Sequence, residues 1–369
     1  MVALVDVGDL VRDEFDLSDL EAIGSYLSQY GERFRERLGA SGRLRFLGEG
    51  GVSHPIVAVD SASIRENLGG GVHILVAGVG VNLSGVLGRG SKIYRFSNNQ
   101  AIDAFCSLVR LAVEFDLIAR LSRGKDYIIL DNSLKALPLD VNYIFYSVLR
   151  EAGYGDSLFE SALDLLQEVF GDGGTCLDAL ERNRLIAVSK ENTSQFIVRE
   201  FQQFLEALGE PESGVRHLNS LNDKALLQFI LKPGEYLVPT LSAMRERRNP
   251  RRRSLFKDKG GEWVSFLPLE SCFRKYSIYH TFFLPRPGAF VQRIEYGLGN
   301  NIEDVLATIR PYCYPEIPEI LHQCKADRYA KAEIHCLKNE YQESLLKLVK
   351  GSDLFRGKFY KILLSKQRS

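Results

Sequence analysis

The pattern of hydrophobic and polar positions between residues 55 and 97 is strand-like. Runs rich in β-branched residues predict three strands at IVAVD (56–60), GVHILVAGVGVNL (71–83) and SKIYRFS (91–97). The short, glycine-containing connections favour an antiparallel meander. The first apolar run stops at Asp60, so we expect this strand to end there.

A helical period follows the predicted meander. Apolar residues recur at Ala104, Leu108, Leu111, Phe115 and Ile118, which predicts a long amphipathic helix that also contains Glu114. DYIILDNSL (126–134) then reads as a buried strand ending at Asp131, helices are expected over 141–183, and RLIAVSKENT (184–193) predicts a strand ending at Lys190. Three strands, a helix, a strand, helices and a strand is the order of a ribonuclease H-like α/β core, with an antiparallel meander plus crossover strands in one mixed sheet.

The remaining chain gives weaker signals. Strands are expected at GEYLVP (234–239), YHTFFLP (279–285) and FVQRIEYGL (290–298), the last two forming a hairpin, and a final helix is expected from about residue 316. We therefore expect an N-terminal helical extension at 1–50, a main α/β domain at 51–340 with helical insertions and a less certain insertion at about 205–270, and a C-terminal helix or tail at 341–369.

Charge and composition narrow the function classes. Lys plus Arg and Asp plus Glu both total 47, so overall charge does not indicate a nucleic-acid partner. A basic run does occur from Arg245 to Lys259, and it is either an arm that contacts a phosphate backbone or a solvated loop. The acidic N-terminal segment and the lack of a long apolar run favour a cytoplasmic protein that does not enter a membrane.

Motifs of several other enzyme classes are missing. The sequence has no G-x-x-x-x-G-K-[ST], G-x-S-x-G or H-E-x-x-H pattern, so no P-loop, common serine-hydrolase or zinc-protease signature is present. The six scattered cysteines suggest reduced thiols. A zinc site could be drawn from the late cysteines with His322 and His335, but no paired C-x-x-C knuckle supports it.

Three carboxylates stand out in the predicted core. Asp60 and Asp131 follow buried strands, and Glu114 lies in the helix between them, so a ribonuclease H-like sheet would bring all three to one edge. Two divalent ions held there could activate a water and stabilise the leaving oxygen of a phosphodiester, and oxygen ligands suit Mg²⁺ or Mn²⁺. The plainer interpretation is that the aspartates cap turns and that Glu114 is solvated.

The sequence resembles the NurA nuclease family over roughly residues 50–340. The segments that carry the resemblance are IVAVDSAS with Asp60, LVRLAVEFD with Glu114, YIILDNSL with Asp131, LIAVSK with Lys190, and CYPEIPEILHQC with Tyr314 and His322. One departure is that Ser61 and Ala62 follow Asp60, where family members usually carry Gly-Ser.

The resemblance implies a manganese-dependent deoxyribonuclease, with Mg²⁺ as a second candidate ion. It implies Asp60, Glu114, Asp131 and His322 as catalytic metal ligands. Lys190, Tyr314, Arg251, Arg252 and Arg253 are expected to contact DNA. Plainer interpretations place His322 near a helix surface, Tyr314 in a core and Lys190 at a solvated strand end.

The resemblance also implies a homodimer that acts on single-stranded DNA and duplex ends, as a 5′–3′ exonuclease and single-strand endonuclease. Its partner would be a HerA-type hexameric ATPase in DNA end resection during double-strand break repair. Two alternatives remain open: a non-catalytic DNA-binding scaffold subunit with the same fold, and a nuclease for structured RNA.

Overall fold

A large mixed sheet forms the centre of the molecule. The computed structural model describes residues 17–48, 51–68, 71–97, 101–122, 126–131, 133–134, 137, 141, 144, 147–148, 156–170, 174–176, 179, 185–189, 194–241, 255–257, 263–265, 277–297 and 299–351. In spatial order, the sheet contains β1 (Leu44–Phe46), β7 (Glu235–Leu237), β11 (Ile278–Phe283), β12 (Gln292–Gly297), β6 (Leu185–Ser189), β5 (Tyr127–Leu130), β2 (Ile56–Leu68), β3 (Gly71–Val81) and β4 (Val86–Phe96), while β8 (Thr240–Leu241) pairs with β11. Two short strands, β9 (Leu255–Lys257) and β10 (Trp263–Ser265), pair separately.

The strand directions confirm the ribonuclease H-like core. Strands β2, β3 and β4 form an antiparallel meander, β5 pairs parallel to β2, and β6 pairs parallel to β5. The parallel pairs need crossover connections, and α3 (Ile102–Leu121) supplies the one before β5. The carboxyl ends of β5 and β6 therefore lie at one edge of the sheet, beside the middle of β2.

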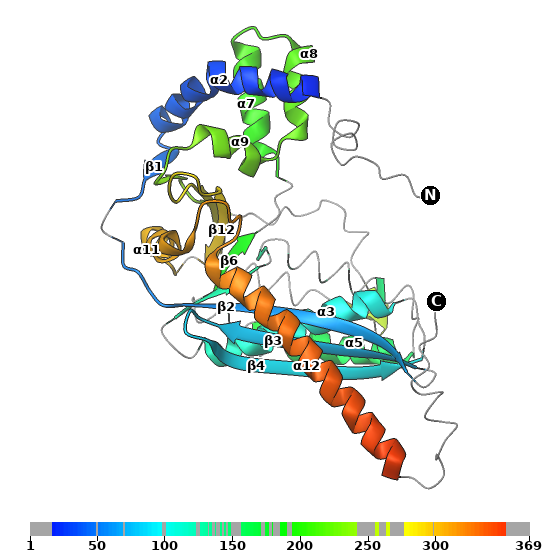
Figure 1. Cartoon of the computed structure of the whole chain (residues 1–369). Helices are drawn as coiled ribbons and strands as arrows, with labels where there is room; N and C mark the ends of the chain where they lie inside the picture. The colour runs from blue at the N-terminus through cyan, green and yellow to red at the C-terminus, as the bar shows by residue number, and fades with distance from the viewer. Residues whose placement is uncertain are drawn as a thin grey trace, which may run out of the picture.

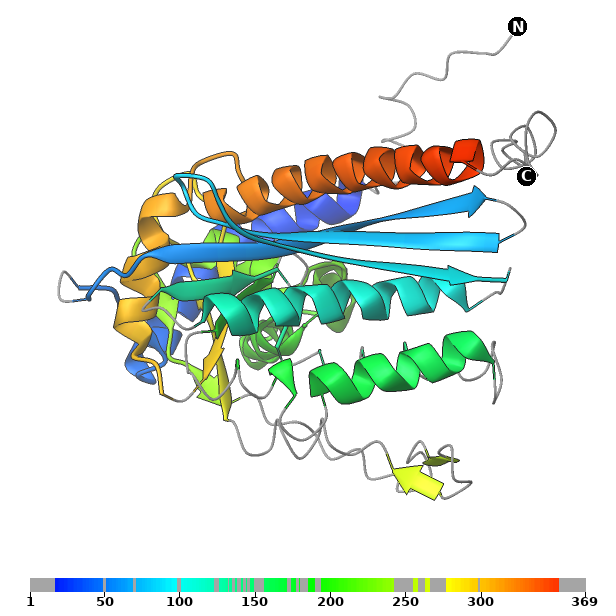
Figure 2. The same cartoon turned by 90° about the horizontal axis from the view of Figure 1, so that it is seen from below.

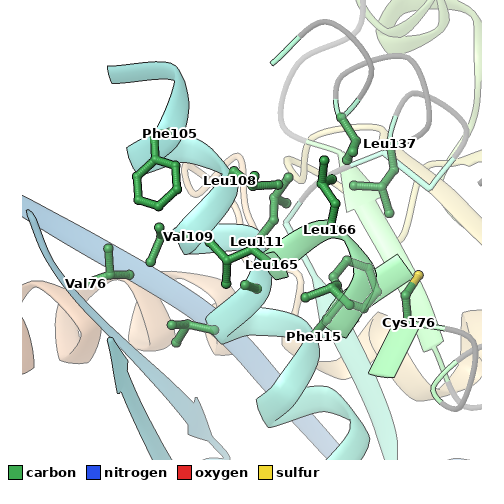
Figure 3. Close-up of a cluster of buried hydrophobic side chains, with 14 of the residues drawn as sticks. Val76, Phe105, Leu108, Val109, Leu111, Phe115, Leu137, Leu165, Leu166 and Cys176 are labelled. Carbon is green, nitrogen blue, oxygen red and sulfur yellow. The ribbon is translucent and has the colours of Figure 1, made fainter. Parts of the chain in front are cut away.

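Helices cover both faces of the meander (Figures 1 and 2). On one face, α3 and α5 (Ser157–Phe170) bury a cluster of large apolar side chains, among them Phe105, Leu111 and Phe115 (Figure 3). On the other face, the long helix α12 (Leu321–Gly351) lies across β2 and β3, where Ile334 packs against Leu75. This sandwich fixes α3 and α12 on opposite sides of the strand that carries Asp60.

Glycines let α3 approach the sheet closely. Gly78 of β3 pairs with Gly90 of β4. A Cβ added at Gly78 would lie 2.6 Å from Val113 Cγ1, so no larger residue fits there without movement. Gly78 is also the partner of Ser61 on β2, and the close approach therefore brings the turn of α3 that contains Glu114 over Ser61.

A helical layer lies beyond the end of the sheet opposite the meander (Figure 1). It consists of α2 (Leu17–Ala40), α7 (Phe196–Ala207), α8 (Glu212–Val215), a 3₁₀ helix (Arg216–Ser220) and α9 (Asp223–Ile230). These helices bury their own core around Phe34 and Phe201, whose ring centroids are 5.0 Å apart. An ion pair between Arg35 and Glu235 joins α2 to β7. Helix α11 (Ile302–Ile309) and a 3₁₀ turn (Arg310–Tyr312) precede α12.

Two expectations about strands and helices are wrong. The first strand does not end at Asp60, because β2 continues its ladder with β3 as far as Leu68. The final helix begins at Leu321 rather than near residue 316, since a turn at Pro315 and a bend at Pro318 precede it. The late strand β12 is paired on both sides, with β11 and β6, so it offers no open edge to a second subunit.

Two expectations about the strands are confirmed. β11 and β12 form the predicted hairpin, and β5 and β6 lie where the sequence placed them. Helix α12 continues without a break through position 340. Among the described residues, no helix is both long and apolar enough to cross a membrane.

Candidate active site

The two aspartates occupy equivalent places on neighbouring parallel strands. Val59 of β2 pairs with Leu130 of β5, so Asp60 and Asp131 are the next residues along each strand. The Asp60 Oδ1 atom accepts a hydrogen bond from the Ser61 amide (2.7 Å) and lies 3.8 Å from the Arg110 guanidinium. Asp60 is therefore partly neutralised from the α3 side.

Glu114 reaches the same edge from α3. Its side chain is buried, with only 3% of the residue exposed, and its Oε1 accepts a hydrogen bond from Ser61 Oγ (2.5 Å). Arg110, one turn earlier on α3, donates to Ser61 Oγ (3.2 Å) and to the Ser61 carbonyl oxygen (2.8 Å). Ser61 thus links the strand to the helix, and Arg110 holds both.

The three carboxylates influence one another. Burial, with a smaller contribution from the negative charges of Asp60 and Asp131, raises the pKa of Glu114 to about 7, although Ser61 and Arg110 act in the opposite direction. Asp60, Glu114 and Asp131 therefore lie within electrostatic reach of one another, as the sequence predicted. Carboxylates that lie close together where water is partly excluded raise the free energy of the folded state unless a cation neutralises them.

Asp131 is held from the α12 side. Gln323 is buried, and its Nε2 donates to Asp131 Oδ1 (3.1 Å) and to the Val188 carbonyl oxygen (2.9 Å). The Gln323 Oε1 atom in turn accepts from the Ile320 amide (3.3 Å). All the polar atoms of this amide are thus committed, which fixes the orientation of the Asp131 carboxylate.

A lysine from the helical layer also reaches this edge. Lys224, at the start of α9, donates to the carbonyl oxygen of Ser189, the last residue of β6 (3.5 Å). Partial burial lowers the pKa of Lys224, and the carboxylates of Asp131 and Glu319 counter that effect. No sequence signal pointed to Lys224, because nothing in its local pattern distinguishes it from a surface lysine.

His322 occupies a different environment from the carboxylates. Its ring is buried and lies edge-on to Tyr312, with 4.5 Å between ring centroids. Burial and the charge of Lys325 lower the pKa of His322 to about 4, so the ring is neutral at pH 7. Its Nδ1 atom has no hydrogen-bond partner among the described residues, and its neighbour Gln323 is the residue that contacts Asp131.

The residues expected to bind DNA are placed only in part. Tyr314 is 40% exposed, and the Arg286 guanidinium lies 5.5 Å from the centre of its ring. Lys190, Arg251, Arg252 and Arg253 lie outside the described residues. The roles of all five residues stay predictions.

The donor chemistry at this edge fits a hard divalent cation. Asp60, Glu114 and Asp131 offer carboxylate oxygens, and mutual repulsion of the kind seen at Glu114 is relieved by a bound ion. As the side chains lie, no three His, Cys, Asp or Glu residues in the described part of the chain are grouped tightly enough to hold one ion together. The argument for a divalent cation therefore rests on the negative charge of this edge and on its carboxylate oxygens.

A comparison with protein-family models identifies the family to which the chain belongs. The model of the NurA domain matches residues 54–332, which include all three carboxylates and His322. The chain belongs to the NurA family. A comparison of the sequence with curated proteins finds no match.

Solved structures agree with this NurA fold. The chain is similar to the NurA nuclease from Sulfolobus solfataricus, with 14% identity, a TM-score of 0.55, and coverage of 93% of this chain and 98% of that chain. A NurA structure with manganese gives 14% identity, a TM-score of 0.47, and coverage of 91% and 99%. Endonuclease V from Ciona intestinalis gives 11% identity, a TM-score of 0.30, and coverage of 86% and 99%. The first of these supports the shared fold.

Sequence reasoning missed the residues that hold the carboxylates. Ser61 was noted only as a departure after Asp60, and Arg110 was not singled out. Arg110 and Glu114 are four residues apart, and this spacing places both on one face of α3. That spacing was the signal by which Arg110 could have been found. Gln323 had no sequence signal beyond its position next to His322.

Proposed function

We propose that this NurA-family chain is a metal-dependent DNA nuclease. The observation that carries the proposal is the gathering of Asp60, Glu114 and Asp131 at one edge of the sheet, with Glu114 buried among them. Such a cluster has little structural purpose, since burying carboxylates near one another opposes folding.

The residues of this edge have separable tasks. Asp60, Glu114 and Asp131 would hold Mn²⁺, or alternatively Mg²⁺, and His322 would join them through its neutral ring. The bound metal would supply an activated water and stabilise the leaving oxygen of the phosphodiester. Ser61 and Arg110 position Glu114 and Asp60, while Gln323 orients Asp131. These hydrogen bonds limit the movement of each carboxylate oxygen before a substrate arrives.

The substrate and partners follow from membership of the family. We infer that the chain degrades DNA from ends as a 5′–3′ exonuclease, cuts single strands, and forms a homodimer with a HerA-type hexameric ATPase in end resection. Tyr314 is partly exposed and so able to stack on a base, while Lys190 and the Arg251–Arg253 segment would contact phosphates.

A cleavage assay with matched aspartate variants tests the nuclease. Asp60→Asn keeps the size of the side chain and removes its charge, and we expect it to slow cleavage of end-labelled DNA in Mn²⁺ by about 10²–10³-fold or more. Asp103→Asn is the control, because Asp103 lies on the same helix as Glu114 with 86% of its side chain exposed. EDTA should abolish cleavage by the wild type.

Three results would change the proposal. Equal cleavage by Asp60→Asn and wild type removes the carboxylates from the mechanism. Salt-sensitive DNA binding without cleavage in any ion identifies the scaffold alternative. Faster cleavage of RNA than of DNA makes the chain a ribonuclease.

The homodimer has a test of its own. Light scattering should give about twice the 41.6 kDa chain mass if the homodimer forms.

A further inference from the structure

Lys224 is placed by α9, a helix outside the core strands, at the edge of the sheet where Asp60, Glu114 and Asp131 gather. We call this edge the carboxylate edge. Its Nζ atom contacts the last carbonyl of β6, and β6 is the parallel neighbour of β5, which ends beside Asp131. The carboxylates of Asp131 and Glu319 both act on its ammonium group. Lys224 therefore introduces a positive charge from α9 at the end of β6, within electrostatic reach of the Asp131 carboxylate that the proposed metal would use.

The position of Lys224 is fixed by capping interactions on both sides of it. The buried Asp223 carboxylate accepts hydrogen bonds from the amides of Phe196 (3.0 Å), Ile197 (2.7 Å) and Val198 (3.0 Å), which ties α9 to the first turn of α7. Asn222 caps α9 itself by accepting from the Ala225 amide (2.9 Å). The backbone at Lys224 is thus anchored at two helix starts, unlike that of an ordinary surface lysine.

Lys232 provides a comparison within the same segment. It follows α9, 57% of its side chain is exposed, and it pairs with the equally exposed Glu32 (2.9 Å). Such a pair contributes little to stability. Lys224 instead lies partly buried against the end of β6, within electrostatic reach of Asp131 and Glu319. A fixed ammonium in such a place interacts more strongly with an added anion than an exposed one does.

We propose that Lys224 is a catalytic residue that contacts a non-bridging oxygen of the scissile phosphate. This inference rests on the proposed nuclease function and deepens it. In this division of tasks, the carboxylates bind the metal, and the ammonium binds the anionic substrate that the carboxylates would otherwise repel. A preorganised charge of this kind stabilises negative charge that develops on the phosphate during hydrolysis.

Two measurements test Lys224 independently of each other. The first is calorimetric binding of deoxyadenosine 5′-monophosphate in Mn²⁺, a probe with a phosphate but no bond for a nuclease to cleave. The second is the single-turnover rate of DNA cleavage. For Lys224→Met we expect binding about 10–100-fold weaker, the usual effect of losing one charge-assisted hydrogen bond, and a fall of at least similar size in rate.

Controls separate a substrate contact from a structural role. Lys224→Arg should recover part of the nucleotide affinity, since it keeps the charge, and Lys232→Met should behave as wild type. Mn²⁺ affinity and melting temperature should stay near wild type in Lys224→Met. Loss of Mn²⁺ binding or folding together with loss of nucleotide binding, and no recovery in Lys224→Arg, would assign Lys224 a structural role and overturn the inference.

The same design keeps the two proposals distinguishable. If the wild type binds the nucleotide but cleaves no DNA, the nuclease proposal fails, while the binding arm still decides the role of Lys224. If the wild type cleaves DNA and Lys224→Met matches it in both arms, the inference fails and the nuclease stands. A wild type that does not bind the nucleotide also overturns the inference.

Discussion

The carboxylate edge has two halves that are built in different ways. In the β2–α3 half, Ser61, Arg110 and Glu114 come from segments about 50 residues apart, joined by hydrogen bonds over separations of 49 and 53 residues. In the β5–α12 half, Gln323 contacts Asp131 across a separation of 192 residues. One half is therefore local in the chain, whereas the other exists only when the C-terminal helix is docked.

The two halves also differ in what stabilises them. Glu114 is buried by close packing of α3 on the glycine positions of β3, so its environment is part of the core. Asp131 is oriented by Gln323 and lies near Lys224, which belongs to the helical layer. Changes in the first half should therefore affect folding and cleavage together, while changes in the second should affect cleavage more than folding.

Among the changes that compare the two halves, Gln323→Leu should have the largest effect. Leucine fills a similar volume but donates no hydrogen bond, so the Asp131 carboxylate loses its fixed orientation and the rate in Mn²⁺ should fall by about 10–100-fold. Single-turnover cleavage measured alongside Mn²⁺ affinity checks this prediction. Gln202→Leu is the matched control, because Gln202 also donates two hydrogen bonds but lies in the helical layer. Equal rates in wild type and Gln323→Leu would contradict a catalytic role for the β5–α12 half.

Gly78→Ala is the corresponding change for the β2–α3 half. The new methyl group would lie 2.6 Å from Val113, whose branched side chain cannot easily turn away, so the free energy of unfolding should fall by about 1–3 kcal/mol. Urea denaturation measures this loss, and cleavage should fall with it because α3 carries Glu114. In Gly88→Ala the nearest atom is 3.5 Å away, which is an ordinary contact. Equal stability of the two variants would show that α3 can move away from the sheet.

The contrast between the halves explains what the sequence could predict. Strand and helix periods are local, and they placed Asp60, Glu114 and Asp131 on the correct elements in the correct order. The end of β2 was misjudged because residues 61–68 carry mostly polar side chains. This part of the strand pairs with β3 alone, and it does not need an apolar pattern on both faces.

Long-range contacts explain what the sequence could not predict. Gln323 and Lys224 are functional candidates only because α12 and α9 dock beside the ends of β5 and β6. No period or motif in a single sequence encodes such docking. The His322 and Tyr314 positions came from family resemblance, and the structure adds that His322 is buried against Tyr312 whereas Tyr314 is partly exposed.

Asp223→Ala probes the link between the helical layer and the edge. It removes the acceptor for three amides at the start of α7, so we expect a loss of about 1–2 kcal/mol in unfolding free energy. Cleavage should also decrease, because the backbone that holds Lys224 is released. Asn301→Ala removes the cap of α11 and should cost stability without this decrease. A drop in stability with unchanged cleavage in Asp223→Ala would mean that the carboxylate edge does not depend on α9.

The smallest effect is expected in the helical layer, at Gly24 of α2. Gly24 is exposed within the helix, and a Cβ added there meets nothing within 4 Å. Gly24→Ala should therefore raise the free energy of unfolding by about 0.5–1 kcal/mol, since alanine restricts the unfolded chain and favours the helix. Cleavage should not change, because the added methyl group meets no neighbour that could transmit an effect to the carboxylates. A loss of stability would reveal a close neighbour of α2, and a loss of cleavage would extend the active site into this layer.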